Sequence, residues 1–210
     1  ARTALITTKG FADVLAIGRQ NRPDIYALVP TKPEPLVPRA WRFEVDERVT
    51  ATGEVLIPLA DDACRPILAT PAVDEIESVA VSLLFSFLAP QHEAKIRTQL
   101  LAAFPHLHVS LSSEILPEYR EYERTATTVI NAYVAPMMSR YLERLADGVQ
   151  PRRLTVMQSN GGVISSATAG HEAARTALSG PAGGVVGARY MAEQAGFEQI
   201  ITFDMGGTST

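Results

Sequence analysis

The last seven residues of the chain, Asp204–Thr210 (DMGGTST), combine the residue types that bind nucleotide phosphates. Glycines lack a Cβ, so the backbone there can approach an anion and direct its N–H groups toward it. A carboxylate beside them can bind phosphate only through water or a metal ion such as Mg²⁺. The alternative is a tight turn in which the glycine pair serves geometry alone. The pattern favours a phosphate and Mg²⁺ site built from Asp204, Gly206, Gly207, Thr208 and Ser209.

A second glycine-rich motif, Ser179–Gly187 (SGPAGGVVG), has the features of a helix start. Proline suits the first turn of a helix, and Ser179 or Gly180 can cap it. Glycines on one face of a helix let a nucleotide lie over the helix start, but they equally let the helix pack closely against a sheet. The Gly-x-Gly that opens a Rossmann fingerprint is absent. The glycines recur at helical spacing on one face: Gly180, Gly183, Gly184 and Gly187.

Two polar segments could also line a site. Gln158–Gly162 (QSNGG) follows an expected strand, where ligand sites of α/β proteins tend to lie, although Asn-Gly is also a common turn dipeptide. Glu118–Arg124 (EYREYER) is dense in charge, which is usually the mark of a solvated face. Because this run precedes a strongly apolar helical stripe, part of it can instead face a cleft.

The sequence gives little support for serine, cysteine or zinc chemistry. Cys64 is the single cysteine, so an internal disulfide is excluded, and no basic cluster nearby would activate its thiol. No serine lies in a Gly-x-Ser-x-Gly elbow. His106 and His108 lack the further ligands that a zinc site needs. Hydrolysis through a serine, a cysteine or zinc is therefore not indicated.

Strand and helix patterns alternate along the chain, which predicts an α/β fold with a largely parallel sheet. A long amphipathic helix is expected from the apolar stripe between Ala126 and Leu145, kinked at Pro136 and ended by Asp147-Gly148. Shorter helices are expected at 11–17, at 90–104 and from Gly180. The expected strands are Thr3–Thr8, 78–88, Leu107–Leu111, 154–157 and 200–203.

The segment from about residue 19 to 75 is rich in proline, which argues against long helices. Trp41–Val45 and 54–57 flank a turn and suggest a hairpin, so the segment is interpreted as a β-rich insertion. Pro151 prevents the long helix from resuming, and a domain boundary is expected near Gln150. This divides the chain into residues 1–150 and 151–210.

Composition narrows the possible partners. With 46% apolar and 20% charged residues, the 210-residue chain is typical of a globular protein. A net charge of -4 provides no basic surface for nucleic acid, and no apolar run approaches the roughly 18 residues of a membrane span. The chain opens with Ala1 and lacks the pattern of a signal peptide. Neither nucleic acid nor a membrane is an expected partner.

Taken together, these motifs resemble the A subunit of ATP-hydrolysing hydantoinases, a family shared with 5-oxoprolinase and the acetone carboxylase β subunit. The resemblance covers essentially the whole chain, in ordered blocks. The blocks are TALITTKGFADVLAIGRQNRPDIYAL (3–28), SLLFSFLAPQHE (82–93), LSSEILPEYREYERTATTVINAYVAP (111–136), MQSNGG (157–162), ALSGPAGGVVGA (177–188) and FDMGGTST (203–210).

The resemblance implies an actin-like ATPase fold, in which two ribonuclease-H-like lobes close over ATP and Mg²⁺. Residues 1–150 would be the remainder of the first lobe and 151–210 the start of the second. Asp204–Thr208 would be the second phosphate loop, with Asp204 serving the metal, and Gly180–Gly184 would lie beside the nucleotide. The first phosphate loop would precede Ala1, so the chain is expected to be incomplete and inactive alone.

The implied activity is that of a cytoplasmic, ATP-dependent cyclic amide hydrolase that works with a hydantoinase B-type subunit or domain. Phosphorylation of the amide oxygen of a hydantoin or a lactam such as 5-oxoproline would activate the ring for opening. Asp204, Arg124 and Asn160 would serve catalysis, with Arg120 on the substrate side. Two alternatives remain open: an ATP-dependent ketone carboxylase of the same family, and a non-catalytic nucleotide-binding or interaction module.

Overall fold

The computed structural model describes residues 1–22, 24–29, 32–70, 75–149 and 154–205. The chain forms two compact units, Ala1–Pro136 and Met137–Thr210. The division falls within the long helix, ahead of the boundary expected near Gln150, a residue that lies outside the described part. The assignment of 1–150 and 151–210 to two lobes of a larger enzyme stays a prediction.

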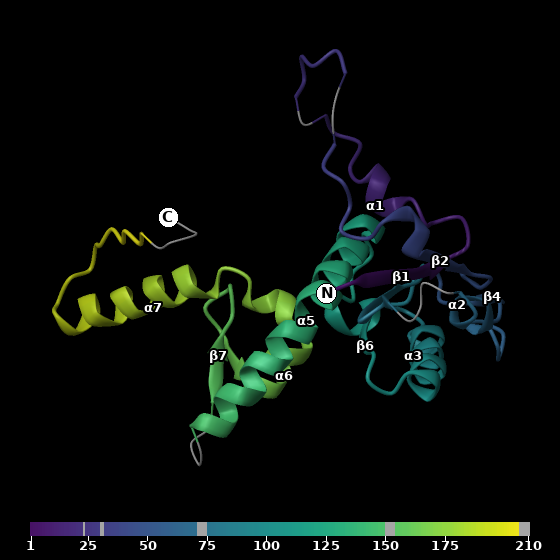
Figure 1. The fold of residues 1–210 in the computed structure, drawn as a ribbon. Coiled ribbons are helices and arrows are strands. Elements are labelled where there is room, and N and C mark those ends of the chain that lie inside the picture. The colour runs from purple at the N-terminus through teal and green to yellow at the C-terminus, as the bar shows by residue number, and fades with distance from the viewer. Residues whose placement is uncertain (23, 30–31, 71–74, 150–153, 206–210) are drawn as a thin grey trace. The chain divides into compact units, whose positions relative to one another are not determined.

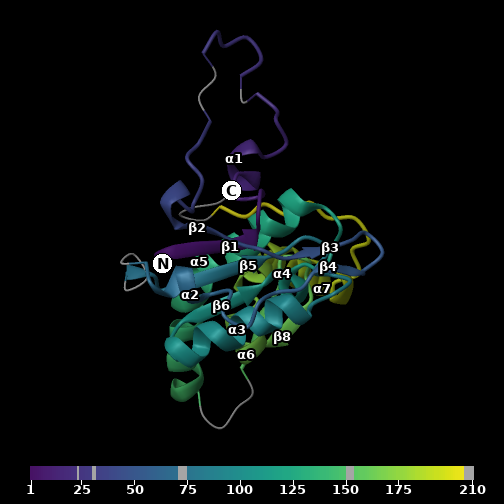
Figure 2. The ribbon, with the colours of Figure 1, turned by 90° about the vertical axis from the view of Figure 1, so that its right-hand side faces the viewer.

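The first unit is built on a four-stranded, fully parallel sheet in the order β2-β1-β5-β6 (Figures 1 and 2). In the register of the sheet, Leu5 lies between Arg42 and Ala80, and Ala80 lies beside Ser110. The parallel α/β sheet expected from the sequence is therefore confirmed. Its strands are β1 (Thr3–Thr8), β2 (Arg42–Val45), β5 (Ser78–Ser82) and β6 (His108–Leu111).

The hairpin expected within the proline-rich segment is only partly correct. β2 does not pair with the strand after the turn but joins the main sheet, parallel to β1. The hairpin is formed instead by β3 (Arg48–Val49) and β4 (Val55–Ile57). The physical reason is burial: β2 begins and ends with buried residues, whereas all of β4 is exposed. The segment thus supplies an edge strand of the sheet as well as an exposed hairpin.

Helices cover both faces of the sheet, as a parallel sheet requires. They are α1 (Val14–Ile17), η1 (Arg39–Trp41), α2 (Arg65–Leu68), α3 (Gln91–Ala103), α4 (Ser112–Ile115) and α5 (Glu121–Gly148). α3 follows Pro90 and α5 ends at Gly148, both as expected, and α5 continues through Pro136. The expected helix at 11–17 is reduced to a single turn. The expected strand at 78–88 stops at Ser82, where the chain turns.

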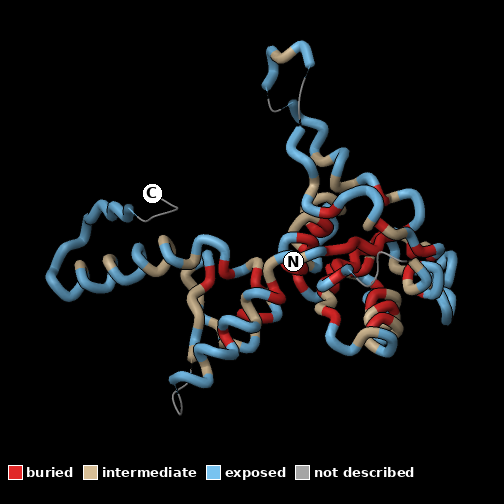
Figure 3. Tube along the Cα trace, viewed as in Figure 1, coloured by how far each residue is buried: buried red, intermediate tan, exposed pale blue. Residues whose placement is uncertain are grey.

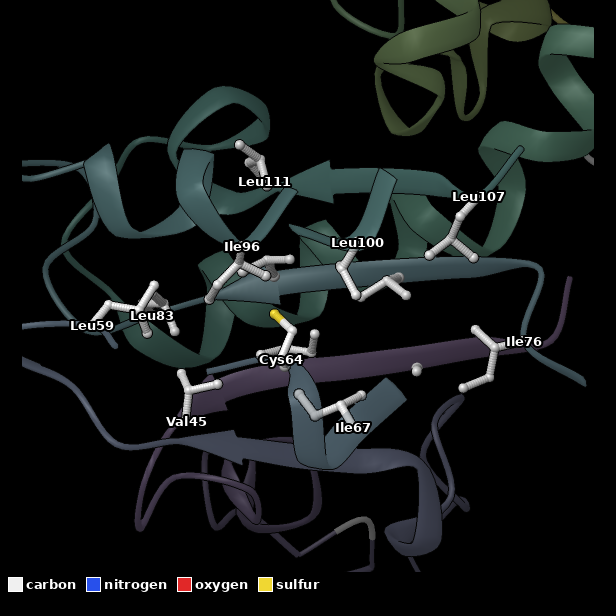
Figure 4. Packing of buried hydrophobic residues seen from close by; sticks show 14 residues of the cluster. Val45, Leu59, Cys64, Ile67, Ile76, Leu83, Ile96, Leu100, Leu107 and Leu111 are labelled. Carbon is white, nitrogen blue, oxygen red and sulfur yellow. The ribbon is translucent and has the colours of Figure 1, made fainter. Parts of the chain in front are cut away.

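Alternation along the strands divides the core in two. One face of the sheet joins Ala4 and Ile6 to α3 through Ile96 and Leu100 (Figure 4). On the other face, Leu5 and Ala80 pack with Val129 and Ala132 of α5. The remaining members of the first cluster are Val45, Leu59, Cys64, Ile67, Ile76, Val79, Val81, Leu83, Leu107 and Leu111.

The single thiol, Cys64, is completely buried in this core. Burial raises the pKa of Cys64 from 9.0 to about 11, so the nucleophilic thiolate is scarce in the folded protein. We expect iodoacetamide at pH 8 to leave Cys64 unmodified until urea unfolds the chain. Because the unfolded thiol ionises first, stability should fall as pH rises from about 9 toward 11. Rapid alkylation of the native protein would contradict this buried placement.

The second unit combines a two-stranded antiparallel sheet with helices. Its elements, besides the end of α5, are β7 (Thr155–Met157), β8 (Val163–Ser165), α6 (Ser166–His171), η3 (Ala173–Thr176) and α7 (Ser179–Gln194). The strand expected at 200–203 is wrong: these residues form no strand. A strand needs a hydrogen-bonding neighbour, and none of the described residues pairs with this segment. Figure 3 shows it exposed, with Ile201 99% accessible.

None of the helices in the described residues is long and apolar enough to cross a membrane.

Candidate functional site

The turn between β7 and β8 contains the predicted site residue Asn160. Its Oδ1 accepts a hydrogen bond from the backbone N–H of Gly162 at 2.9 Å, which closes a turn of the Asx type. The turn is held from the other side by Ser159, whose N–H donates to the carbonyl oxygen of Arg175 at 2.9 Å. Gly161 has φ +83°, a conformation that glycine adopts without cost. The Asn-Gly pair therefore serves the turn in this structure.

Helix α7 begins at Ser179 and carries the predicted glycine face. Its N-cap is Leu178, in the left-handed conformation with φ 60°, and no side chain caps the helix. The expectation that Ser179 or Gly180 caps this helix is therefore wrong, because the helix starts at Ser179 itself. A Cβ added to Gly180 would meet nothing within 4 Å, whereas one on Gly183 would contact Met157 at 3.9 Å. The glycine face is thus only lightly packed.

Gly184 and Asp204 lie side by side. A Cβ on Gly184 would be 3.9 Å from Oδ2 of Asp204, so the carboxylate lies next to the bare backbone of the helix. Both residues line a hollow of about 450 Å³ between α7 and the segment 200–204, together with Val185, Ala188 and Ala192. The structure therefore brings together two residues predicted from separate motifs, twenty positions apart. Gly206, Gly207, Thr208 and Ser209 lie outside the described residues.

Asn160 does not share this hollow. The turn that holds Asn160 approaches α7 at Val186, since a Cβ on Gly161 would lie 3.3 Å from Val186 Cγ2. Each residue rotates the helix by about 100°, so Val186 is rotated by about 200° from Gly184 around the axis of α7. The turn and Asp204 therefore contact nearly opposite sides of α7, and the structure gives Asn160 no contact with the glycine–carboxylate pair.

Arg124, in the first unit, is a buried residue. It is 1% exposed, and its guanidinium donates to the carbonyl oxygens of Glu118 at 2.6 Å and Leu83 at 2.8 Å. The guanidinium carbon lies 5.4 Å from the ring centroid of Phe87. Burial lowers the pKa of Arg124, although a guanidinium remains protonated. Arg120, one turn earlier, is exposed.

A buried carboxylate that the sequence did not reveal, Glu93, belongs to the same region. Its Oε1 accepts from the N–H of Leu83 at 2.9 Å and from Ser112 Oγ at 2.6 Å. Its Oε2 accepts from the N–H and the hydroxyl of Ser113 at 2.9 and 2.7 Å. Leu83 is therefore held from both sides, by Glu93 at its N–H and by Arg124 at its carbonyl. In the sequence, Glu93 resembles an ordinary acid in the first turn of a helix.

The described residues contain no group of three or more His, Cys, Asp or Glu side chains arranged to hold a metal ion. A lone carboxylate beside open backbone nevertheless suits Mg²⁺, which is usually bound by one or two carboxylates together with substrate phosphates and water. Gly184 and Asp204 fit such a role, whereas they could not form a zinc site.

Two family models match the chain, and together they cover most of it. The hydantoinase/oxoprolinase N-terminal region matches residues 1–104, and the hydantoinase/oxoprolinase model matches residues 124–210. The chain belongs to the hydantoinase/oxoprolinase family. The family that was suggested by the sequence motifs is thereby confirmed.

Relatives with named activities align with nearly the whole chain. Caprolactamase subunit alpha of Pseudomonas jessenii is 33% identical over 99% of this chain and 31% of its own length. The crystal structure of the ATP-dependent caprolactamase from that organism has a TM-score of 0.80 at 30% identity, over 99% of this chain and 31% of that one. The α/β fold is therefore shared.

Two further members show the range of the family. 5-Oxoprolinase 1 of Arabidopsis thaliana is 37% identical over 100% of this chain and 18% of its own length. A nucleotide-free structure of acetone carboxylase, from a study of ATP-dependent acetone carboxylation, has a TM-score of 0.80 at 29% identity, over 93% of this chain and 29% of that one. The chain thus spans about a third or less of the relatives that it matches.

Proposed function

We propose that the chain is part of an ATP-dependent enzyme that opens a cyclic amide ring, of the hydantoin or lactam type. The observation that carries this proposal is the placement of the Asp204 carboxylate beside Gly184, in a family whose members include a caprolactamase and 5-oxoprolinases. The bare helix backbone gives a polyphosphate access, and the carboxylate gives a divalent cation an oxygen ligand. ATP and Mg²⁺ are accordingly the proposed co-substrate and metal.

The chemistry explains why such a hydrolysis uses ATP. An amide is a poor electrophile because of its resonance, and transfer of the terminal phosphoryl group to the amide oxygen makes the ring carbon far more reactive toward water. Mg²⁺ and backbone N–H groups would neutralise the charge that develops on the phosphates. Asp204 would hold the metal, while Gly180, Gly183 and Gly184 would leave room for the nucleotide. Arg124 and Asn160 were also predicted to serve catalysis; in the structure Arg124 is buried within the first unit, and the side chain of Asn160 closes its own turn.

The larger assembly is part of the same proposal. We place the chain in an actin-like, two-lobed ATPase, with residues after 150 beginning the second lobe. The names of relatives such as caprolactamase subunit alpha and acetone carboxylase beta subunit support a partner subunit, for which a hydantoinase B-type chain is the candidate. Cytoplasmic location is expected for an enzyme that consumes ATP.

The test is to measure, in the full-length protein, both nucleotide binding and the fate of candidate substrates. Calorimetry with ATP and Mg²⁺ should show binding that weakens about tenfold or more in Asp204→Ala, because the metal loses its ligand. ATP-coupled ring opening should then be found for a hydantoin, 5-oxoproline or ε-caprolactam. Consumption of acetone and bicarbonate instead would favour the ketone carboxylase that the acetone carboxylase structure suggests. Nucleotide binding without any turnover would favour the non-catalytic module.

A further inference from the structure

A cavity of about 480 Å³ lies in the first unit, between α1, the described part of the segment 19–36 and the start of α5. This volume is in the range of about 300–1,000 Å³ that is typical of small-molecule sites. The floor of the cavity is apolar and comes from two elements of the fold. α1 contributes Leu15 and Ile17, and α5 contributes Ala126, Val129 and Ile130.

The rim of the cavity is polar and balanced in charge. Arg19, Asn21, Lys32 and Glu34 line it. Arg19 Nε pairs with Glu123 Oε1 at 2.8 Å, and Lys32 Nζ donates to the carbonyl oxygen of Ile17 at 3.2 Å. The two cations, Arg19 and Lys32, are matched in number by the carboxylates of Glu34, on the rim, and Glu123, the partner of Arg19. The rim therefore offers hydrogen-bond donors and acceptors without a strong net charge. Such a rim suits a neutral polar molecule better than a polyphosphate.

Part of the cavity wall is formed where Gly18 approaches Tyr122. Gly18 has φ +57°, and a Cβ built there would be 3.6 Å from the ring of Tyr122, which also lines the cavity. The chain therefore turns tightly over the Tyr122 ring as it leaves α1. Because Arg19 is tied to the next residue of α5, Glu123, the rim is anchored to the same helix as the floor.

We propose that this cavity binds the cyclic amide, a neutral ring with an apolar body, one carbonyl and one N–H. The choice of an amide rests on the proposed function. The apolar floor matches the ring methylenes, which gain free energy when they leave water. Arg19, Lys32 and Asn21 can donate to the ring carbonyl, and Glu34 or Asn21 can accept from the ring N–H. An amide held in this way satisfies both of its polar groups, as a buried polar ligand must.

The experiment uses ε-caprolactam as the probe and measures its binding to the full-length protein by saturation-transfer NMR and calorimetry. Ala126→Phe places a ring in the cavity and should weaken binding about tenfold or more. Ala102→Phe, on the exposed side of α3, is the matched control and should leave binding unchanged. Should Ala126→Phe fold poorly, Lys32→Met removes an exposed donor and should weaken binding about threefold or more.

Nucleotide binding, measured on the same samples, separates this inference from the proposed function. Loss of caprolactam binding in Ala126→Phe, with ATP affinity and the unfolding midpoint retained, supports the cavity as the amide site. Unchanged caprolactam binding in both Ala126→Phe and Lys32→Met overturns it, even if ATP-dependent ring opening is observed. If the protein binds caprolactam in the cavity but never binds ATP, the cavity assignment stands and the proposed function fails.

Discussion

Replacement of Asp204 by alanine is expected to lower kcat for the proposed ATP-dependent ring opening about a hundredfold or more in the full-length protein. The carboxylate lies against the Gly184 backbone, where it is the acidic side chain lining the hollow beside α7. Its loss would remove an oxygen ligand from the metal that screens the phosphates. Asp204 is exposed, so the fold itself should be unaffected. Phosphate release and ring opening, measured together, test both parts of this expectation.

Glu198→Ala provides the matched control, because Glu198 is another exposed acid a few residues earlier in the same segment. It should leave kcat and the unfolding midpoint unchanged. Asp204→Asn, which keeps the size of the side chain but loses its charge, should resemble Asp204→Ala if metal binding is the role. Turnover of Asp204→Ala at the normal rate would remove Asp204 from the mechanism and, with it, the residue on which the proposed function depends.

Much of the fold of the first unit follows from local patterns. Thr3–Thr8 is a continuous run of apolar and β-branched residues, and such a run specifies a strand buried on both faces. The stripe on α5 and the proline before α3 likewise determine those helices. The partner of β2 could not be predicted, because the sequence of a four-residue strand does not specify the strand with which it pairs. Pairing is decided by burial across the whole sheet.

The candidate site was predictable in its components but not in its geometry. Glycine spacing located α7, and the acid before two glycines located Asp204, but no local signal shows that Gly184 faces this carboxylate. The Asn160 turn shows the opposite case. Its sequence suits a ligand site and a turn equally, and only the structure shows its side chain closing the turn. The strand expected at 200–203 failed because an apolar segment becomes a strand only where it finds a partner.

Arg124 is the residue for which the structure most changes the interpretation, and its replacement should be strongly destabilising. We expect Arg124→Met to lower the free energy of unfolding by about 3 kcal/mol. Methionine retains the contact with Phe87 but cannot donate to the carbonyl oxygens of Leu83 and Glu118, which would lose these hydrogen bonds. It would also leave the buried Glu93 without the nearby positive charge. Urea unfolding followed by circular dichroism measures the change.

Arg120→Met is the matched control for the stability of Arg124→Met. Arg120 lies one turn before Arg124 but is exposed, so its replacement should not shift the unfolding midpoint. If Arg124→Met lowers the unfolding midpoint while Arg120→Met does not, the buried guanidinium stabilises the packing of Leu83, the residue after β5, against the start of α5. If Arg124→Met is as stable as the parent but has lost turnover, the structural role is refuted. The catalytic role predicted from the family resemblance would then be the better explanation for a charge buried at this position.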